Sequence, residues 1–297
     1  MFKNQMLKEI CQIRAAVQKK APLIHCITNP ISIHDCANIV LAAGGRPMMA
    51  EHPAEVEEIT VTAGALALNL GNITDARKAS ILIAGRTAMS RDIPVILDMV
   101  GIGCSHFRKE ITEEFLQQRV PGAPLILKGN MSELKALAGA DCGVSGVDVD
   151  PKDVLSEENR AETIGLAKSV ARTYGAVVLA SGKTDLVTDG KQVCLISNGS
   201  EMMSRITGTG CMLNVLTAAY MSAEKPMAAA VAACVVLGIS GEIAAELCRG
   251  TDSLQSRSGQ FCGTGSFQIA FQDALSCMTD EEICRRIRIA FADSDTE

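Results

Sequence analysis

The stretch IPVILDMVG (Ile93–Gly101) decides the fold class, because it is a short apolar run that ends in one charged residue, Asp98. Such a run is typical of a strand that is buried on both faces of a sheet. Four similar runs follow the same pattern: LIHCIT (Leu23–Thr28), ALALNLG (Ala65–Gly71), APLILKGN (Ala123–Asn130) and AVVLASG (Ala176–Gly182). Helical patterns separate them, which predicts an α/β fold with a central, mostly parallel sheet and helices on both faces.

Helix signals lie between and around these strands. The N-terminal segment 1–20 spaces apolar residues three to four apart, as an amphipathic helix does. We expect further helices over 35–44, 75–91, 132–139 and 158–174, with Ser132 as an N-cap. Asp189-Gly190 predicts an antiparallel hairpin, and the chain from Thr209 onward has a mostly helical pattern.

Composition excludes several classes of protein. The chain has 297 residues, of which 47% are hydrophobic and 21% charged, as in a globular protein with a substantial core. The net charge of −6 and the lack of a basic stripe argue against a nucleic-acid partner. Neither an internal repeat nor a linker rich in Pro, Gly or Ser divides the sequence, so we expect a single domain over 1–297.

The cysteines and apolar segments indicate a reduced, cytoplasmic protein with no membrane partner. None of the twelve cysteines forms a C-x-x-C pair, which argues against a zinc ribbon or a thioredoxin-type motif. The N-terminus lacks the apolar region of a secretory signal. The longest apolar run, Met227–Ile239, is shorter than the roughly 20 residues that cross a bilayer. We interpret it as a buried helix.

Small, polar or charged residues follow each of the five apolar runs. These strand ends are Thr28-Asn29, Asn69–Gly71, Asp98–Gly101, Lys128–Asn130 and Ser181-Gly182. In an open parallel sheet, ligands bind at the carboxyl ends of the strands. Five such ends in one chain predict a ligand site along one edge of the sheet.

The common nucleotide-binding motifs are absent, but one glycine-rich turn remains. ASGKTD (180–185) is no P-loop, because Val177 stands where that motif needs glycine. The turn TGTGCML (207–213) precedes an apolar helix, and backbone N–H groups at such a helix start bind phosphate. Cys211 falls in the first turn of this helix, where the pKa of a thiol is expected to be lowered. A plain turn with a buried cysteine is the equally favoured alternative.

Two carboxylates are candidate metal ligands. Asp98 ends an apolar strand, where an unpaired charge is costly, and Glu133 follows Lys128-Gly129-Asn130. Together they offer oxygen ligands for Mg²⁺, directly or through water. The alternatives are a capping role for Asp98 and a helix first-turn role for Glu133. The four histidines have no metal-ligand spacing, and we expect them to be structural.

In this order, the motifs resemble the hydroxyethylthiazole kinase family of the ribokinase-like superfamily. The resemblance runs from HCITNPIS (25–32) to GTGSFQIAF (263–271), and its most specific segments include ILDMVGIG (96–103), LKGNMSEL (127–134) and TGTGCML (207–213). Most ribokinase-like enzymes carry an aspartate base after the glycine-rich turn, whereas thiazole kinases carry a cysteine, as at Cys211. The resemblance implies a three-layer fold without a separate lid, and a homotrimer with active sites at subunit interfaces.

The resemblance also implies the reaction and the residues that serve it. The reaction is ATP-dependent phosphorylation of 4-methyl-5-(2-hydroxyethyl)thiazole in thiamine biosynthesis or salvage, with Mg²⁺. The implied residues are Cys211 for catalysis; Met49, Gly208, Asn29 and Ile31 for the thiazole; Lys128 and Ser181 for ATP; Gly208, Thr209 and Gly210 for an anion hole; and Asp98 and Glu133 for the metal. The polar loop 138–159 is a candidate cover for the nucleotide.

The chain departs from the family pattern at three positions. Met99 replaces a usual proline, Lys128 a usual arginine and Ser181 a usual threonine. Lys128 keeps the charge of arginine without its planar fork. Three other functions remain open: a sibling kinase for hydroxymethylpyrimidine or another small alcohol such as a sugar, a hydrolase or acyltransferase with Cys211 as nucleophile, and a non-catalytic nucleotide-binding regulator.

Overall fold

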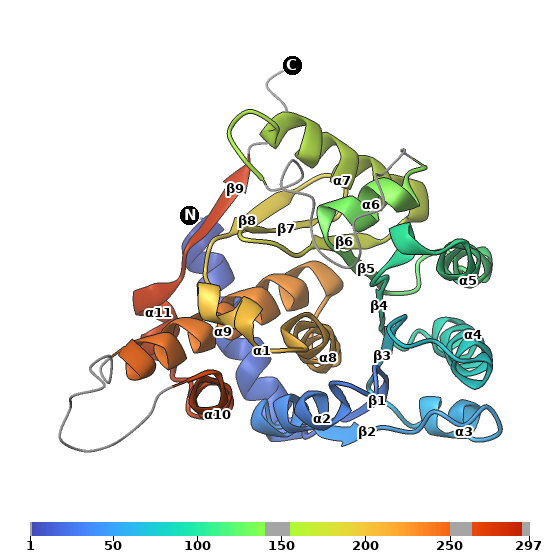
Figure 1. The fold of residues 1–297 in the computed structure, drawn as a ribbon, viewed down its shortest axis with the longest axis horizontal. Helices are drawn as coiled ribbons and strands as arrows, with labels where there is room; N and C mark the ends of the chain where they lie inside the picture. Colours follow the sequence, from blue (N-terminus) through green and yellow to red (C-terminus); the bar gives the residue numbers. More distant parts are fainter. Residues whose placement is uncertain (1, 140–154, 250–262, 293–297) are drawn as a thin grey trace.

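The computed structural model describes residues 2–139, 155–249 and 263–292 (Figure 1). Its strands are β1 (Leu23–Ile27), β2 (Arg46–Met48), β3 (Ala65–Asn69), β4 (Val95–Asp98), β5 (Leu125–Gly129), β6 (Val177–Ala180), β7 (Asp185–Thr188), β8 (Val193–Ile196) and β9 (Ile289–Ala292). Its helices are α1 (Phe2–Lys20), α2 (Ile33–Ala42), α3 (Val56–Thr60), α4 (Asp75–Ser90), α5 (His106–Gln117), α6 (Met131–Leu137), α7 (Arg160–Tyr174), α8 (Thr209–Met221), α9 (Pro226–Arg249), α10 (Thr264–Ser276) and α11 (Asp280–Arg286), with short 3-10 turns η1 (Ile102–Cys104) and η3 (Glu201–Arg205).

The strands form one mixed sheet. Within the described residues its order is β2-β1-β3-β4-β5-β6-β7-β8-β9. The pairs from β2 to β6 are parallel, and the pairs from β6 to β9 are antiparallel. The expected hairpin is the pair β7–β8, and Gly190 in its turn has a left-handed φ of +89°. The predicted α/β class with a mostly parallel sheet is therefore confirmed.

Helices cover both faces of the sheet because its strands alternate apolar side chains between the two faces. Ala65 and Ala67 of β3 belong to one core cluster, with α1, α2, α8 and α9, whereas Leu66 and Leu68 belong to the other, with α4, α5 and α7. Figure 1 shows α2 and α8 on one side of β1, β3 and β4, and α4 and α5 on the opposite side. This arrangement confirms the three-layer prediction.

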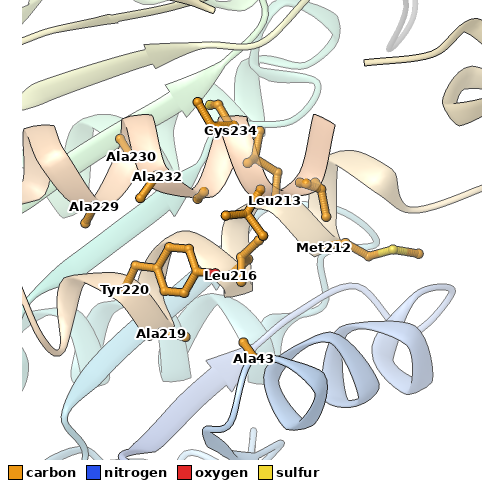
Figure 2. Packing of buried hydrophobic residues seen from close by; sticks show 14 of the residues in the cluster. Ala43, Met212, Leu213, Leu216, Ala219, Tyr220, Ala229, Ala230, Ala232 and Cys234 are labelled. Carbon is orange, nitrogen blue, oxygen red and sulfur yellow. The ribbon is translucent and has the colours of Figure 1, made fainter. Parts of the chain in front are cut away.

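Small residues let helices α8 and α9 pack closely. Ala229, Ala230 and Ala232 of α9 are fully buried, as is Leu216 of α8. Figure 2 shows side chains from both helices in this cluster, with Ala43 at the end of α2 beside α8. The cluster holds α8 against the sheet, and this contact fixes the position of the glycine-rich turn at the N-terminus of α8.

Helix α9 confirms the predicted buried helix, but the helix is longer than the apolar run Met227–Ile239, which was judged too short to cross a bilayer. The apolar run is part of a 24-residue helix, and its segment Pro226–Cys248 is long and apolar enough to cross a membrane. However, 83% of the most apolar 18-residue stretch of this helix is buried inside the protein, as in the core helix of a soluble protein.

Some local expectations differ from the structure. Ser132 is not the N-cap of α6, because the helix already begins at Met131 and Asn130 caps it. The short strand β2, the helices α3 and α5, and the C-terminal strand β9 were not predicted. β2 and β9 lie at the two edges of the sheet. β2 has only three residues, with a proline among them, and β9 follows two residues after α11 in a segment with a mostly helical pattern. Most of the predicted loop at 138–159 lies outside the described residues.

Candidate functional site

Three polar side chains lie in one row at the carboxyl edge of the sheet. The strand register pairs Asn69 of β3 with Asp98 of β4, and Asp98 with Lys128 of β5. Because strand side chains alternate between faces, this row continues the face of Ala65 and Ala67, which packs against α8. The register therefore places an amide, a carboxylate and an ammonium group side by side beneath α8.

Hydrogen bonds connect this row to Cys211. Lys128 Nζ donates to Asp98 Oδ2 at 2.8 Å, and Asn69 Nδ2 donates to the same oxygen at 3.0 Å. Asn69 Nδ2 also lies 3.5 Å from Cys211 Sγ, to which it donates, while Asn69 Oδ1 accepts from the backbone N–H of Gly71 at 2.8 Å. Asn69 was visible in the sequence only as part of a polar strand end and was not predicted as a site residue, although its place at the end of an apolar strand matches that of Asp98.

The Lys128–Asp98 ion pair is buried, with Lys128 only 3% exposed. Burial alone would lower the pKa of Lys128, but the adjacent Asp98 carboxylate opposes that effect and raises the pKa above its ordinary value. Lys128 therefore stays charged at neutral pH and supplies a fixed positive charge under the glycine-rich turn. A Cβ atom at Gly210 would lie 3.6 Å from Lys128 Nζ, which shows how close the two are.

The glycine-rich turn has the geometry of an anion site. Gly208 caps α8 with a left-handed φ of +83°, a conformation that other residues adopt with strain. A Cβ atom at this position would also lie 2.7 Å from the Cβ of Ser32. The backbone N–H groups of Thr209, Gly210 and Cys211 belong to the first turn of the helix, where they have no partner within it. These groups and the helix dipole favour a bound anion.

The predicted lowering of the Cys211 pKa is wrong. Burial, and next the negative charge of Asp98, raise the pKa of the Cys211 thiol above its ordinary value. Hydrogen bonds from Ser32 and Asn69 and the charge of Lys128 act in the opposite direction without cancelling this increase. The position in the first helical turn was visible in the sequence, but the neighbouring carboxylate and the burial come from the tertiary fold. In the protein without bound ligands, burial and the charge of Asp98 therefore favour the protonated thiol of Cys211.

Glu133 is buried in a local hydrogen-bond arrangement at the start of α6. Its Oε2 accepts from the backbone N–H of Asn130 at 2.7 Å, and the Asn130 side chain accepts from the N–H of Glu133, which forms a capping box. Glu133 Oε1 accepts from the N–H of Gly101 at 2.7 Å. Burial, followed by the charge of Asp98, raises the pKa of Glu133 to about 7, although both backbone bonds favour the ionised form.

The two candidate metal ligands therefore differ in what they offer a cation. Both hydrogen bonds to the Asp98 side chain within the described residues end on Oδ2, so Oδ1 is available to a ligand. Both oxygens of Glu133 already accept backbone hydrogen bonds, which suits contact with a hydrated cation through water. The part of the chain that the structure describes contains no group of three or more His, Cys, Asp or Glu residues arranged around a metal.

The predicted acceptor-side residues follow β1 and β2. Asn29 comes after β1, and its side chain lies against the β3–α4 turn: a Cβ at Gly71 would be 2.6 Å from Asn29 Nδ2. Asn29 Oδ1 accepts from the N–H of Ile31, whose side chain is 63% exposed. Met49 follows β2 and is half-buried against the same core cluster as Cys211. The structure thus places Asn29 beside the turn after Asn69, whereas Ile31 faces solvent.

Ser181 lies on the opposite side of the row. It follows β6, which is the neighbour of β5, and its backbone N–H donates to the carbonyl of Gly129 at 2.8 Å. Its hydroxyl is 3.5 Å from the same carbonyl. The edge of the sheet therefore presents Asn29 at one end, Ser181 at the other, and the Asn69–Asp98–Lys128 row between them.

Comparisons with known proteins agree on one family. The model of the hydroxyethylthiazole kinase family matches residues 14–281. Hydroxyethylthiazole kinase 2 of Clostridium botulinum (strain Hall) is 44% identical over 278 residues, which cover 94% of this chain and 98% of the relative. The hydroxyethylthiazole kinase of the Eklund strain of that species is 36% identical over 287 residues, with 96% and 98% covered.

Solved structures support the same fold. The hydroxyethylthiazole kinase of Pyrococcus horikoshii superposes with a TM-score of 0.81 at 30% identity, covering 96% of this chain and 100% of the other. A ribokinase-like superfamily protein of Enterococcus faecalis matches with a TM-score of 0.54 at 11% identity, covering 87% and 88%. The second likeness shows the fold alone.

Proposed function

The chain belongs to the hydroxyethylthiazole kinase family, and from this premise we propose how its own residues carry out the reaction of that family. The reaction is phosphorylation of the primary hydroxyl of 4-methyl-5-(2-hydroxyethyl)thiazole, which yields the thiazole phosphate for thiamine biosynthesis. ATP is the phosphoryl donor, and ADP is the second product. The observation that carries the proposal is the buried Lys128–Asp98 pair directly beneath the N-terminus of α8.

The turn 208–211 holds the transferred phosphoryl group. Phosphoryl transfer passes through a loose transition state with charge spread over the phosphoryl oxygens, so catalysis depends mainly on positioning and on charge stabilisation. The N–H groups of Thr209, Gly210 and Cys211 and the dipole of α8 supply fixed partial positive charge there. Lys128 adds a full positive charge, which its contact with Asp98 holds in place.

Cys211 positions the acceptor alcohol rather than removing its proton in advance. Its raised pKa keeps it a thiol at neutral pH, so it is a poor general base before the phosphoryl group moves. A thiol next to the anion site still orients the hydroxyl toward phosphorus, and Asn69 Nδ2 donates a hydrogen bond to the sulfur at 3.5 Å. The same raised pKa argues against Cys211 as a covalent nucleophile, which would need to be a thiolate.

Mg²⁺ fits the oxygen-rich end of β4. We assign Asp98 to the ion through its available Oδ1, and Glu133 through water, since both Glu133 oxygens hold backbone N–H groups. The bound ion would neutralise charge on the phosphates of ATP. We assign Met49, Asn29 and Ile31 to the thiazole. Ser181, which follows the strand next to that of Lys128, is assigned to the nucleotide together with Lys128.

The assembly and location follow from the same premise. We propose one kinase domain over 1–297 that forms a homotrimer in the cytoplasm, with active sites at the subunit interfaces. Exposed apolar side chains near the acceptor side support an interface there: Ile31 is 63% exposed and Met48 is 39% exposed. In a trimer, such side chains become buried against a neighbouring subunit.

A substrate panel tests the function. ADP release by the wild-type protein is measured in parallel as a function of the concentration of the thiazole alcohol, hydroxymethylpyrimidine and ribose. We expect the thiazole alcohol to give the highest kcat/KM by a wide margin. Preference for the pyrimidine alcohol or for ribose would assign the chain to a sibling kinase, and ATP binding without turnover on any alcohol would make it a regulator.

A further inference from the structure

We propose that Arg77 is a positioning residue that connects the segment carrying Met49 to the turn that holds Asn69. This connection keeps the acceptor alcohol at a fixed position relative to Cys211. The inference deepens the proposed function and rests on it. Arg77 lies in the first turn of α4 and is only 2% exposed, which is exceptional for an arginine. A buried guanidinium group is costly unless it is paired. Both Nη groups of Arg77 donate hydrogen bonds to carbonyls of the site, whereas Nε makes no hydrogen bond and lies within ion-pair distance of Glu51.

One side of Arg77 binds the turn after β3. Its Nη2 donates to the carbonyl of Asn69 at 3.0 Å, and its Nη1 donates to the carbonyls of Gly71 and of Asn72, the latter at 2.8 Å. Asn72 has a left-handed φ of +52°, so this turn adopts a strained conformation that the arginine holds. The same turn fixes the Asn69 carboxamide, which contacts Asp98 and Cys211, and lies against Asn29.

The other side of Arg77 faces the segment after β2. Arg77 Nε lies 3.3 Å from Glu51 Oε2, close enough for an ion pair. Two further buried groups hold the same segment: Ser80 Oγ donates to the carbonyl of Glu51 at 2.8 Å, and His25 Nε2 donates to the carbonyl of Ala50 at 2.9 Å. These contacts hold Ala50 and Glu51 in place. Both residues directly follow Met49, and Met49 is the residue that we assign to the thiazole.

Of the side chains Arg77, Ser80 and His25, Arg77 is thus the one that contacts both the segment after β2 and the turn after Asn69. If the Arg77 side chain is lost, this segment and this turn can move relative to each other. A displacement of about 1 Å between an acceptor and a catalytic group can cost about 100-fold in rate. Lysine retains the charge but reaches fewer carbonyls than the planar fork of arginine, so Arg77→Lys should give a partial effect.

Arg119 offers a control of the same residue type, half-buried where Arg77 is fully buried. It also donates to several backbone carbonyls, including those of Tyr174 at 3.3 Å and Gly175 at 2.7 Å, and burial lowers its pKa as it lowers that of Arg77. However, its partners precede β5 and β6, so it lies at the amino edge of the sheet, opposite the site. Removing it tests what the loss of a carbonyl-binding arginine does to folding alone.

The experiment compares Arg77→Met, Arg77→Lys and Arg119→Met with the wild type by steady-state kinetics and thermal unfolding. We expect Arg77→Met to raise KM for the thiazole alcohol about tenfold and to lower kcat, with KM for ATP within about twofold of the wild type. Arg77→Lys should recover part of both losses. Arg119→Met should lower Tm while its two KM values stay near those of the wild type.

The outcomes separate the inference from the proposed function. KM for the alcohol unchanged in both Arg77 variants, or raised equally in Arg119→Met, would overturn the positioning role while leaving the kinase function intact. If Arg77→Met does not fold, Arg77→Lys decides on the same KM comparison. A wild-type protein that neither binds nor phosphorylates the alcohol would overturn the proposed function, and the role of Arg77 with it.

Discussion

Lys128 Nζ lies 2.8 Å from Asp98 Oδ2, and the two residues are directly paired in register on the neighbouring parallel strands β5 and β4. Their side chains are both about 4% exposed, so the pair is isolated from solvent on the sheet side and lies beneath the first turn of α8. In this geometry Lys128 neutralises the buried carboxylate of Asp98 and also supplies positive charge next to the anion site.

Removal of the ammonium group should therefore affect both stability and nucleotide binding. Lys128→Ala leaves Asp98 buried without its cation, which typically costs about 3–5 kcal/mol of unfolding free energy. We expect KM for ATP to rise more than KM for the alcohol, and Lys128→Arg to retain activity because arginine also binds phosphate. Urea unfolding and steady-state kinetics measure the two effects. Equal changes in the two KM values would remove Lys128 from the ATP site.

Substitutions of Cys211 should impair the enzyme without abolishing turnover. A positioned general base contributes about 10²–10⁴-fold, and a thiol with a raised pKa in a loose phosphoryl transfer should contribute at the low end or less. Cys211→Ala should thus keep measurable kcat, and Cys211→Asp should stay active. Complete loss of activity in both variants would instead favour a covalent role for the thiol.

The two glycines of the turn should tolerate substitution unequally. Gly208→Ala introduces a Cβ only 2.7 Å from that of Ser32 at a left-handed φ, so we expect a large loss of kcat together with a lower Tm. Gly210→Ala places its Cβ 3.6 Å from Lys128 Nζ, an ordinary contact, and should fold with a Tm near that of the wild type. A more severe fall in Tm for Gly210→Ala than for Gly208→Ala would contradict this description of the turn.

The metal assignment predicts a change in the Mg²⁺ requirement. Asp98→Asn and Glu133→Gln should each raise the Mg²⁺ concentration that gives half-maximal turnover, by about tenfold or more. Glu282→Gln, on the exposed face of α11, serves as a control that should not alter it. Titrations of turnover with Mg²⁺ at saturating ATP provide the comparison. An unchanged requirement in both site variants would exclude these carboxylates from the metal site.

Local patterns identified the parts of this site, whereas their relations depend on the tertiary fold. Asp98 and Lys128 were visible as polar ends of apolar runs, but their pairing in one row with Asn69 depends on strand order and register. The turn at Gly208 was likewise visible in the sequence. The pKa of Cys211 was wrongly predicted because burial and Asp98 outweigh its place at a helix start. Arg77 gave no signal in the sequence, since a helix-surface arginine and a buried one look alike.

The most direct test of the central claim is the identity of the product. The wild-type protein and Gly208→Ala are incubated with ATP, Mg²⁺ and the thiazole alcohol, and the products are analysed by phosphorus NMR and mass spectrometry. We expect the wild type to form ADP and a monophosphate ester at the primary hydroxyl in equal amounts, and Gly208→Ala to form far less of both. ADP formed with free phosphate and no phosphorylated thiazole would contradict this expectation.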